Sequence, residues 1–194
     1  MLRQLRPALV ILAGLTLLTG VVYPAVVTLG AHAFFPGRAA GSWVSRGDTI
    51  VGSKLIGQWF DDPGHFWGRP SATAPVPYDA DASGGSNLAP SNPALSDSIL
   101  TRAQRLRAAD PANVAPIPAD LLTASASGLD PDISPAAAEF QVERVARVRG
   151  MAANELRTLV VHATTGRTFG LFGDPRVNVL FLNLALDSAA AERR

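Results

Sequence analysis

A charge-free apolar segment near the start of the chain constrains the fold more than any other feature. Between Pro7 and Pro36 the sequence contains no Asp, Glu, Lys or Arg. About 20 such residues in a helix, at about 1.5 Å each, match the roughly 30 Å hydrocarbon core of a bilayer. We therefore expect a transmembrane helix over residues 7–29, preceded by a short cytoplasmic N-terminus, residues 1–6. Pro24 should kink this helix, because proline removes one backbone donor.

A cleaved secretion signal is the alternative interpretation of the same segment. Ala31-His32-Ala33 resembles a small-x-small cleavage site. Cleavage after Ala33 would release an exported soluble periplasmic protein. The apolar region of a signal peptide runs to only about 7 to 15 residues, and this run is longer. The length therefore favours an uncleaved anchor.

The orientation follows from the size of the segment after the anchor. Basic residues flank the apolar run on both sides, with Arg3 and Arg6 before it and Arg38 and Arg46 after it. Long domains cross a membrane largely regardless of their charge. We therefore expect a single-pass protein of the cell (inner) membrane in contact with membrane lipid, its N-terminus cytoplasmic and its main domain, residues 30–187, extracytoplasmic.

The composition limits what the main domain can do. The 194 residues are 47% hydrophobic, enough for one ordinary domain, and the 17 basic and 16 acidic residues are mixed along the chain. A nucleic-acid-binding groove is therefore not expected. The chain has no cysteine, which excludes disulfides, thiolate catalysis and cysteine-ligated zinc.

Periodicity and capping signals predict the elements of this domain. Short strands with bends are expected in residues 48–60, and an ordered, irregular surface segment in residues 61–93. Helices are predicted from Pro93 to Asp110, over Pro135–Arg149, and around Leu156–Ala163. Residues 177–186 have the length and composition of a buried strand, although a helix also fits them. The fold class is α+β, with one N-terminal transmembrane helix, a single extracytoplasmic mixed α/β domain and a flexible tail, residues 188–194.

Local motifs for catalysis or metal binding are missing from the sequence. His32, His65 and His162 share no metal-ligand spacing, and the only lysine, Lys54, is not part of a phosphate-binding Walker loop. No signature of a serine nucleophile is present. The glycine pair in residues 83–87 allows a backbone nest for an anion, but a turn is the simpler interpretation. We predict no catalytic residue and no metal site.

Five ordered sequence blocks resemble the signature blocks of a known family. They are Gly52-Ser-Lys-Leu-Ile-Gly-Gln58, Gly68-Arg-Pro-Ser-Ala72, Ser83-Gly-Gly-Ser-Asn-Leu88, Thr123-Ala-Ser-Ala-Ser-Gly-Leu-Asp130 with Ile133-Ser-Pro-Ala-Ala137, and Arg176-Val-Asn-Val179 with Asn183-Leu-Ala-Leu186. Together with the N-terminal anchor they cover essentially the whole chain. The chain thus resembles the KdpC family, the C subunits of bacterial high-affinity potassium-transporting ATPases.

The resemblance implies a non-catalytic accessory subunit of an ATP-driven potassium uptake pump. Its partners would be a channel-like A subunit, a P-type ATPase B subunit and a small F subunit, in a complex that uses ATP, Mg and potassium, while this chain itself binds no cofactor. The residues agree with that role. No Asp-Lys-Thr-Gly phosphorylation motif is present, and one helix cannot enclose a pore.

The resemblance also suggests which residues carry the function. We expect a docking surface toward the channel-like subunit that stabilises assembly, made of Gln58, Arg69, Ser71, Ser83, Gly84, Gly85, Ser86, Asn87 and Leu88. The alternative is that the glycines and prolines of residues 83–93 only build tight turns of the domain. A role proposed for the family, raising the nucleotide affinity of the ATPase subunit as a catalytic chaperone, would involve Gln141. Without that role Gln141 would be an ordinary solvated helix residue.

Overall fold

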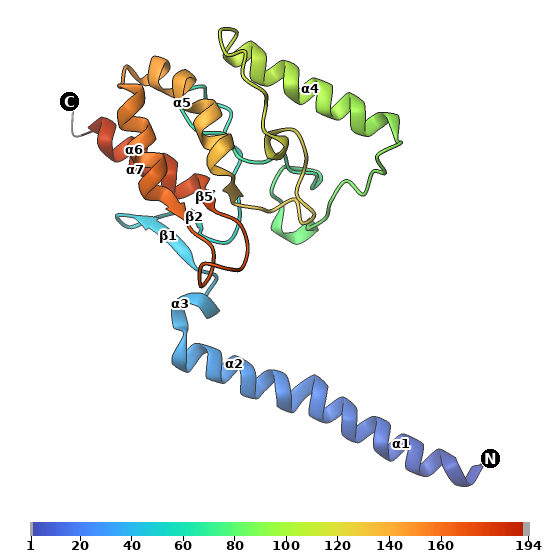
Figure 1. Ribbon diagram of the computed structural model, residues 1–194. Helices are drawn as coiled ribbons and strands as arrows, with labels where there is room; N and C mark the ends of the chain where they lie inside the picture. The colour runs from blue at the N-terminus through green and yellow to red at the C-terminus, as the bar shows by residue number, and fades with distance from the viewer. Residues whose placement is uncertain (1, 192–194) are drawn as a thin grey trace. The chain divides into compact units, whose positions relative to one another are not determined.

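The computed structural model describes residues 2–191 and divides into two compact units. The first unit extends to Ser53 and the second begins at Lys54. Figure 1 shows the elements of both units in chain order.

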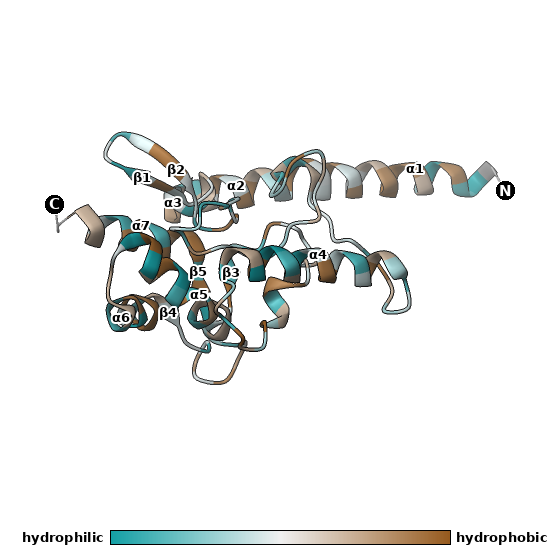
Figure 2. Cartoon of the chain, turned by 90° about the horizontal axis from the view of Figure 1, so that it is seen from above, coloured by the Kyte–Doolittle hydropathy of each residue, from teal (hydrophilic) through white to brown (hydrophobic). Residues whose placement is uncertain are grey.

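A long apolar helical run forms most of the first unit. It consists of α1 (Leu2–Leu17), a π-helical turn (Leu18–Val22) and α2 (Tyr23–Phe34). Residues Arg3–Phe34 form a continuous helix of 32 residues that contains an 18-residue window with a mean hydropathy of 2.2, so it is long and apolar enough to cross a membrane. Apolar residues recur along it in Figure 2. The expected N-terminal apolar helix is confirmed, while the limits of its membrane-embedded part stay a prediction.

Pro24 changes the hydrogen bonding of this helix. Proline has no backbone N–H, and its ring collides with the carbonyl group four residues earlier, here that of Gly20. The turn just before Pro24 is widened to a π-helix, in which the Tyr23 N–H donates to the carbonyl oxygen of Leu18. The helix thus accommodates Pro24 by a local π turn and continues through it.

A short helix and a hairpin complete the first unit. After α3 (Pro36–Ala39), strands β1 (Trp43–Arg46) and β2 (Thr49–Ser53) pair antiparallel with a bulge between Val44 and Ser45. Gly47, with a φ of 61°, turns the chain between them. Strand β2 lies where short strands were predicted, and β1 was not predicted.

The second unit combines helices with a small sheet, which confirms the α+β class. Its helices are α4 (Pro93–Ala109), α5 (Pro135–Arg149), α6 (Ala153–Ala163) and α7 (Val179–Ala191). Strands β3 (Asp132–Ile133), β5 (Arg176–Asn178) and β4 (Thr164–Thr165) form an antiparallel sheet in the order β3-β5-β4. Short 3-10 helices occupy Ala80–Ala82 and Ala119–Leu121. Residues 61–93 are otherwise irregular, as predicted.

The capping signals place the predicted helix ends correctly. The side chain of Asn92 accepts a hydrogen bond from the Ala94 N–H at 3.0 Å, where α4 begins, and Ser134 accepts one from Ala137 at 3.0 Å at the start of α5. Gly150 ends α5 in the left-handed conformation, with a φ of 63°. Helices α5, α6 and α7 enclose a core that includes Val142, Val145, Leu156, Leu182 and Leu186, all at 0% exposure.

The strand predicted for residues 177–186 is wrong. Strand β5 ends at Asn178, and the rest of the segment is the first part of α7. Its buried residues are Val179, Leu180, Leu182, Asn183 and Leu186, so burial follows the helical spacing i, i+3, i+4, i+7. Asn178 also accepts a hydrogen bond from the Phe181 N–H at 3.2 Å, as a helix cap does. Of the predicted flexible tail, residues 188–191 belong to α7, and residues 192–194 lie outside the described part of the chain.

Candidate functional site

An extended segment, Phe66–Trp67, lies buried in the second unit and is held by two side-chain amides. Asn183 of α7 accepts a hydrogen bond from the Phe66 N–H at 2.9 Å and donates one to its carbonyl oxygen at 3.0 Å. Gln141 of α5 likewise accepts a hydrogen bond from the Trp67 N–H at 2.8 Å and donates one to the Trp67 carbonyl oxygen at 3.1 Å. Each amide therefore makes the pair of hydrogen bonds that a neighbouring β-strand would otherwise make, and the buried main chain stays fully hydrogen-bonded.

Gln141 is not the solvated residue that its position on an arginine-bearing helix suggested. The residue is 1% exposed. Its Oε1 also accepts a hydrogen bond from Arg144 at 2.6 Å, and its Nε2 also donates to the carbonyl oxygen of Ala137 at 3.1 Å. With two donors and two acceptor positions, the amide has its full complement of partners inside the domain.

Arginines of α5 bind the carbonyl groups just before this segment. Arg144 donates to the carbonyl oxygens of Pro63 and His65, and Arg149 donates to that of Gly64 at 2.7 Å. Burial lowers the pKa of Arg144 to about 10, so its guanidinium stays charged at neutral pH. Arg149 also contacts Asp187 of α7 at 2.8 Å. Residues 63–67 are therefore fixed along their whole length by α5 and α7.

Ser71, one of the predicted docking residues, lies at the centre of a second hydrogen-bond network. Its hydroxyl donates to the carbonyl oxygen of Gly128 at 2.7 Å and accepts from the Tyr78 N–H at 2.9 Å. It also lies 2.9 Å from the Thr73 hydroxyl. This network joins the sequence block at residues 68–72 to the block at residues 123–130, more than fifty residues later, with a separation of 57 positions between Ser71 and Gly128.

The first half of the glycine-rich stretch packs against the same loop. Gly84 donates its N–H to the carbonyl oxygen of Ser127 at 2.9 Å, and the Ser83 hydroxyl donates to that oxygen at 3.1 Å. A Cβ on Gly85 would lie only 2.9 Å from the Ala126 carbonyl oxygen. Glycine at position 85 thus allows two backbones to approach closely.

The second half of the stretch is presented outward. Ser86 and Asn87 are exposed, and Leu88 is half-buried. Asn87 has a φ of 50°, in the left-handed region that asparagine tolerates better than most residues. The stretch therefore has a packed base, residues 83–85, and an exposed tip at residues 86 and 87.

Gln58 and Arg69 lie on the flank of this loop cluster. The Gly57 N–H, next to Gln58, donates to the carbonyl oxygen of Leu129 at 2.9 Å. Arg69 forms an ion pair with Asp130 at 2.9 Å. The structure thus brings the predicted docking residues from three sequence blocks against residues 126–130, and we name this group, residues 57–58, 68–73, 83–88 and 126–130, the loop cluster.

Tyr78 joins the loop cluster through its phenol group. The Tyr78 hydroxyl donates to the carbonyl oxygen of Arg69 at 2.5 Å, and its ring occupies the space beside Gly57 and Gly68. Burial, reinforced by the Asp130 carboxylate and opposed by Arg69, raises the pKa of Tyr78 to about 12. The phenol is therefore neutral and hydrogen-bonded throughout the physiological range.

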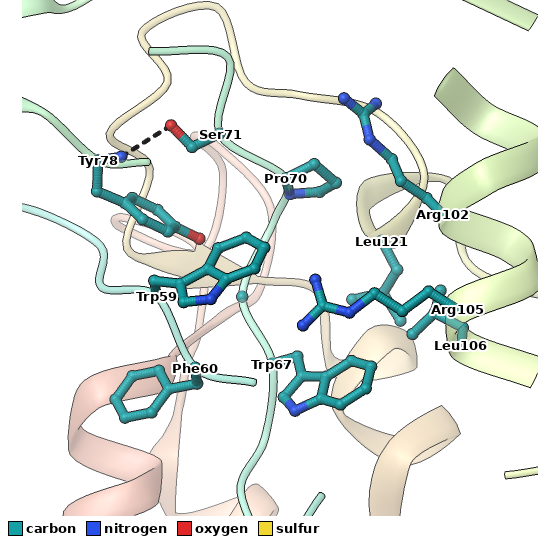
Figure 3. Close-up of a pocket in the computed structure, with 11 residues that line it drawn as sticks. Trp59, Phe60, Trp67, Pro70, Ser71, Tyr78, Arg102, Arg105, Leu106 and Leu121 are labelled. Carbon is teal, nitrogen blue, oxygen red and sulfur yellow. Dashed lines mark hydrogen bonds between the residues drawn. The ribbon is translucent and has the colours of Figure 1, made fainter. Parts of the chain in front are cut away.

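A small cavity beside the loop cluster was not predicted from the sequence. Its volume is about 140 Å³, and aromatic rings and two arginines of α4 line it (Figure 3). Arg105 lies 4.6 Å from the ring centroids of both Trp59 and Trp67. The two tryptophans and the spacing of Arg102 and Arg105 on one helix were visible in the sequence, but no local pattern indicates that they meet.

Metal ligands do not cluster within residues 2–191. His65 instead lies 3.3 Å from Asp187 and 2.7 Å from Arg149, in the network that holds residues 63–67. The arrangement is one of rigid, hydrogen-bonded loops and a small basic cavity.

Comparison with known proteins gives consistent matches along the chain. The model of a family described as KdpC, the K+-transporting ATPase c chain, matches residues 5–188. A protein of Variovorax paradoxus named potassium-transporting ATPase KdpC subunit is 62% identical over 189 residues, covering 97% of this chain and 98% of the relative. Proteins of the same name from Sorangium cellulosum, 60% identical, and Polaromonas naphthalenivorans, 62% identical, match 97% and 95% of this chain and 100% and 94% of their own lengths.

Proposed function

The chain belongs to the KdpC family, and from this premise we propose that it is a non-catalytic accessory subunit of an ATP-driven potassium-transporting ATPase. The observation that carries the proposal is the nearly full-length similarity to relatives named as KdpC subunits of such an ATPase. A potassium-uptake assay in cells tests it. Deletion of the chain should abolish high-affinity uptake, and normal uptake without it would refute the proposal.

The long apolar helix supports a single-pass membrane anchor. In this proposal residues 7–29 span the cell membrane, the N-terminus is cytoplasmic, and residues 30–187 lie outside. Ala33 belongs to the last turn of α2, so release by cleavage there would cut within the helix. The mass of the mature protein distinguishes the two possibilities. A chain that retains its N-terminal residues and resists alkaline carbonate extraction supports the anchor, and a chain that begins at Phe34 supports the exported soluble protein.

The loop cluster is the surface that we assign to assembly. A docking surface binds best when its shape is fixed beforehand, because little conformational entropy is then lost on binding. The base of residues 83–85 is packed and hydrogen-bonded, and the exposed tip at Ser86 and Asn87 has no large side chain to reorder. We assign this surface to the channel-like subunit, with the assembly of that subunit and the P-type ATPase subunit as the outcome.

Co-purification from detergent tests the docking surface. Replacing Ser86 with alanine and Asn87 with glycine removes both side chains and keeps the left-handed backbone available. The expected result is reduced recovery of the other subunits at unchanged membrane levels of this chain. Gln104→Ala, an exposed change on α4, is the control. Normal recovery with the Ser86/Asn87 variant would remove the tip from the docking surface.

Any effect of this chain on the nucleotide affinity of the ATPase subunit is produced by the docked domain as a whole. The Gln141 amide is fully used in holding Trp67 and Arg144, so its contribution is to the shape of the domain. We propose that any rise in the nucleotide affinity of the ATPase subunit is transmitted through the assembled complex. Labelled ATP should then bind the ATPase subunit more tightly when this chain is present. Saturable binding of ATP to this chain alone would contradict indirect action.

A further inference from the structure

The guanidinium group of Arg105 lies between two indole rings at the edge of the cavity. Arg105 projects from α4, and Figure 3 shows it reaching between Trp59 and Trp67. Its Cζ lies 4.6 Å from each ring centroid. Arg144 also lies over Trp67, at 4.4 Å. Contacts of this kind stabilise an arginine through the negative faces of the rings and fix its position.

The N–H groups of Arg105 have no acceptor in the described part of the chain. No hydrogen bond or ion pair joins its side chain to any of residues 3–191, whereas its neighbour Arg102 donates to the carbonyl oxygen of Leu122 at 2.7 Å. Cation–π contacts use the faces of the guanidinium plane and leave its edges free. Arg105 is exposed, so those edges can meet a ligand.

The cavity has the charge and the lining of a site for an organic anion. Two basic residues, Arg102 and Arg105, are among the residues that line it, and no acidic residue is. Its other walls are mainly apolar or aromatic, with Tyr78, Pro70 and Leu121 among them, and Ser71 also contributes. A volume of about 140 Å³ accommodates a group of only a few heavy atoms.

We propose that this cavity binds the carboxylate group of a small aliphatic acid or side chain, with Arg105 as its principal partner. Arginine matches a carboxylate with two parallel N–H···O bonds. A planar carboxylate can bind in the same plane as the guanidinium group and so fit into the gap between the two indoles. Sulfate and phosphate are tetrahedral, and some of their oxygens would point toward the rings. The apolar walls then cover the aliphatic part. The carboxylate comes either from a free small acid or from an acidic residue of a partner subunit; the second source rests on the proposed function, and the first does not.

The experiment measures binding of isobutyrate to the full-length protein in detergent at constant ionic strength, by saturation-transfer NMR of the ligand methyl protons. Isobutyramide, a neutral analogue of the same shape, and sulfate as a competing anion are the controls for charge and for planarity. The variants are Arg105→Gln and Arg105→Lys, with Arg167→Gln, an exposed arginine outside the cavity lining, as the matched control. Circular dichroism verifies that each variant is folded.

The expected result is saturable isobutyrate binding that weakens at least tenfold in Arg105→Gln. In Arg105→Lys the affinity should fall to a smaller extent, because lysine keeps the positive charge but cannot form the two parallel N–H···O bonds. Arg167→Gln should bind as the unmodified chain does. Repeating the measurement on the complex co-purified with its partner subunits separates the two sources. Loss of the signal in the complex indicates a partner carboxylate in the cavity, and its retention indicates a free acid. The proposal is overturned by absent saturation in the full-length chain, by equal binding of isobutyramide, by full displacement with equimolar sulfate, or by an unchanged affinity in Arg105→Gln.

Discussion

The side-chain amide of Gln141 forms two hydrogen bonds with the main chain of Trp67, one to its N–H at 2.8 Å and one from its Nε2 to the carbonyl oxygen at 3.1 Å. The two residues are 74 positions apart. Asn183 repeats this arrangement at Phe66, so an irregular segment crosses the core without losing its backbone hydrogen bonds. This pairing connects helices α5 and α7 to the loops that carry the proposed docking surface and the cavity.

Replacing Gln141 with leucine should destabilise the second unit strongly. The change keeps the volume but leaves the Trp67 main chain and one Arg144 donor without partners in the core. Each unpaired buried group costs about 1 to 3 kcal/mol, so we expect a loss of at least about 3 kcal/mol in the free energy of unfolding. Urea unfolding followed by tryptophan fluorescence measures it. Glu139→Gln, an exposed change on the same helix, should cost less than about 1 kcal/mol, and equal losses in the two variants would contradict this role for Gln141.

Two adjacent glycines should respond oppositely to alanine. A Cβ at Gly85 would lie 2.9 Å from the Ala126 carbonyl oxygen, whereas at Gly84 the nearest atom is 3.9 Å away. We expect Gly85→Ala to lower stability by about 1 to 3 kcal/mol through overpacking. Gly84→Ala should be neutral or slightly stabilising, because it restricts the unfolded chain. Thermal unfolding of both variants measures the difference, and a similar melting temperature for the two would show that the base of the loop cluster is not tightly packed.

Tyr78 should make stability fall at high pH. Its folded-state pKa of about 12 lies above the ordinary value of 10.0, so its contribution is complete below pH 10 and is lost as the pH rises through 12. The shift corresponds to at most about 2 to 3 kcal/mol. Tyr78→Phe removes the titrating group. Urea unfolding of both proteins between pH 8 and pH 12 should show that the stability advantage of the unmodified chain shrinks with pH, since groups common to both cancel. Parallel stability curves would refute this assignment.

Two substitutions of Asn87 distinguish the effect of backbone strain from the effect of partner contact at the tip of the loop cluster. Asn87 has a φ of 50°, a conformation in which alanine is strained by about 1 kcal/mol relative to glycine. Substitution by either residue removes the side-chain amide. If the amide contacts the channel-like subunit, Asn87→Ala and Asn87→Gly should both reduce co-purification of the partner subunits. Stability should fall only with alanine. Reduced recovery with alanine alone would indicate that loop shape, and not the side chain, matters for docking.

Features that depend on residues close together in the chain could be predicted from the sequence. A charge-free run of sufficient length predicts the apolar helix, because a membrane-spanning helix satisfies all its backbone groups internally. Asn92 before Pro93, Ser134 before Pro135 and Gly150 define helix ends through interactions within one or two turns. The ordered blocks were enough to indicate the family.

Features that depend on contacts between distant segments became visible only in the folded chain. Composition could not separate strand from helix in residues 177–186, because a fully buried apolar run suits either, and packing against α5 and α6 selects the helix. Gln141 looks solvated in its own helix, yet Phe66 and Trp67 bury it by bringing a main chain that needs its amide. Trp59, Trp67 and Arg105 likewise meet only in the folded chain, because a cation–π contact requires closeness in space and leaves no periodic trace in the sequence.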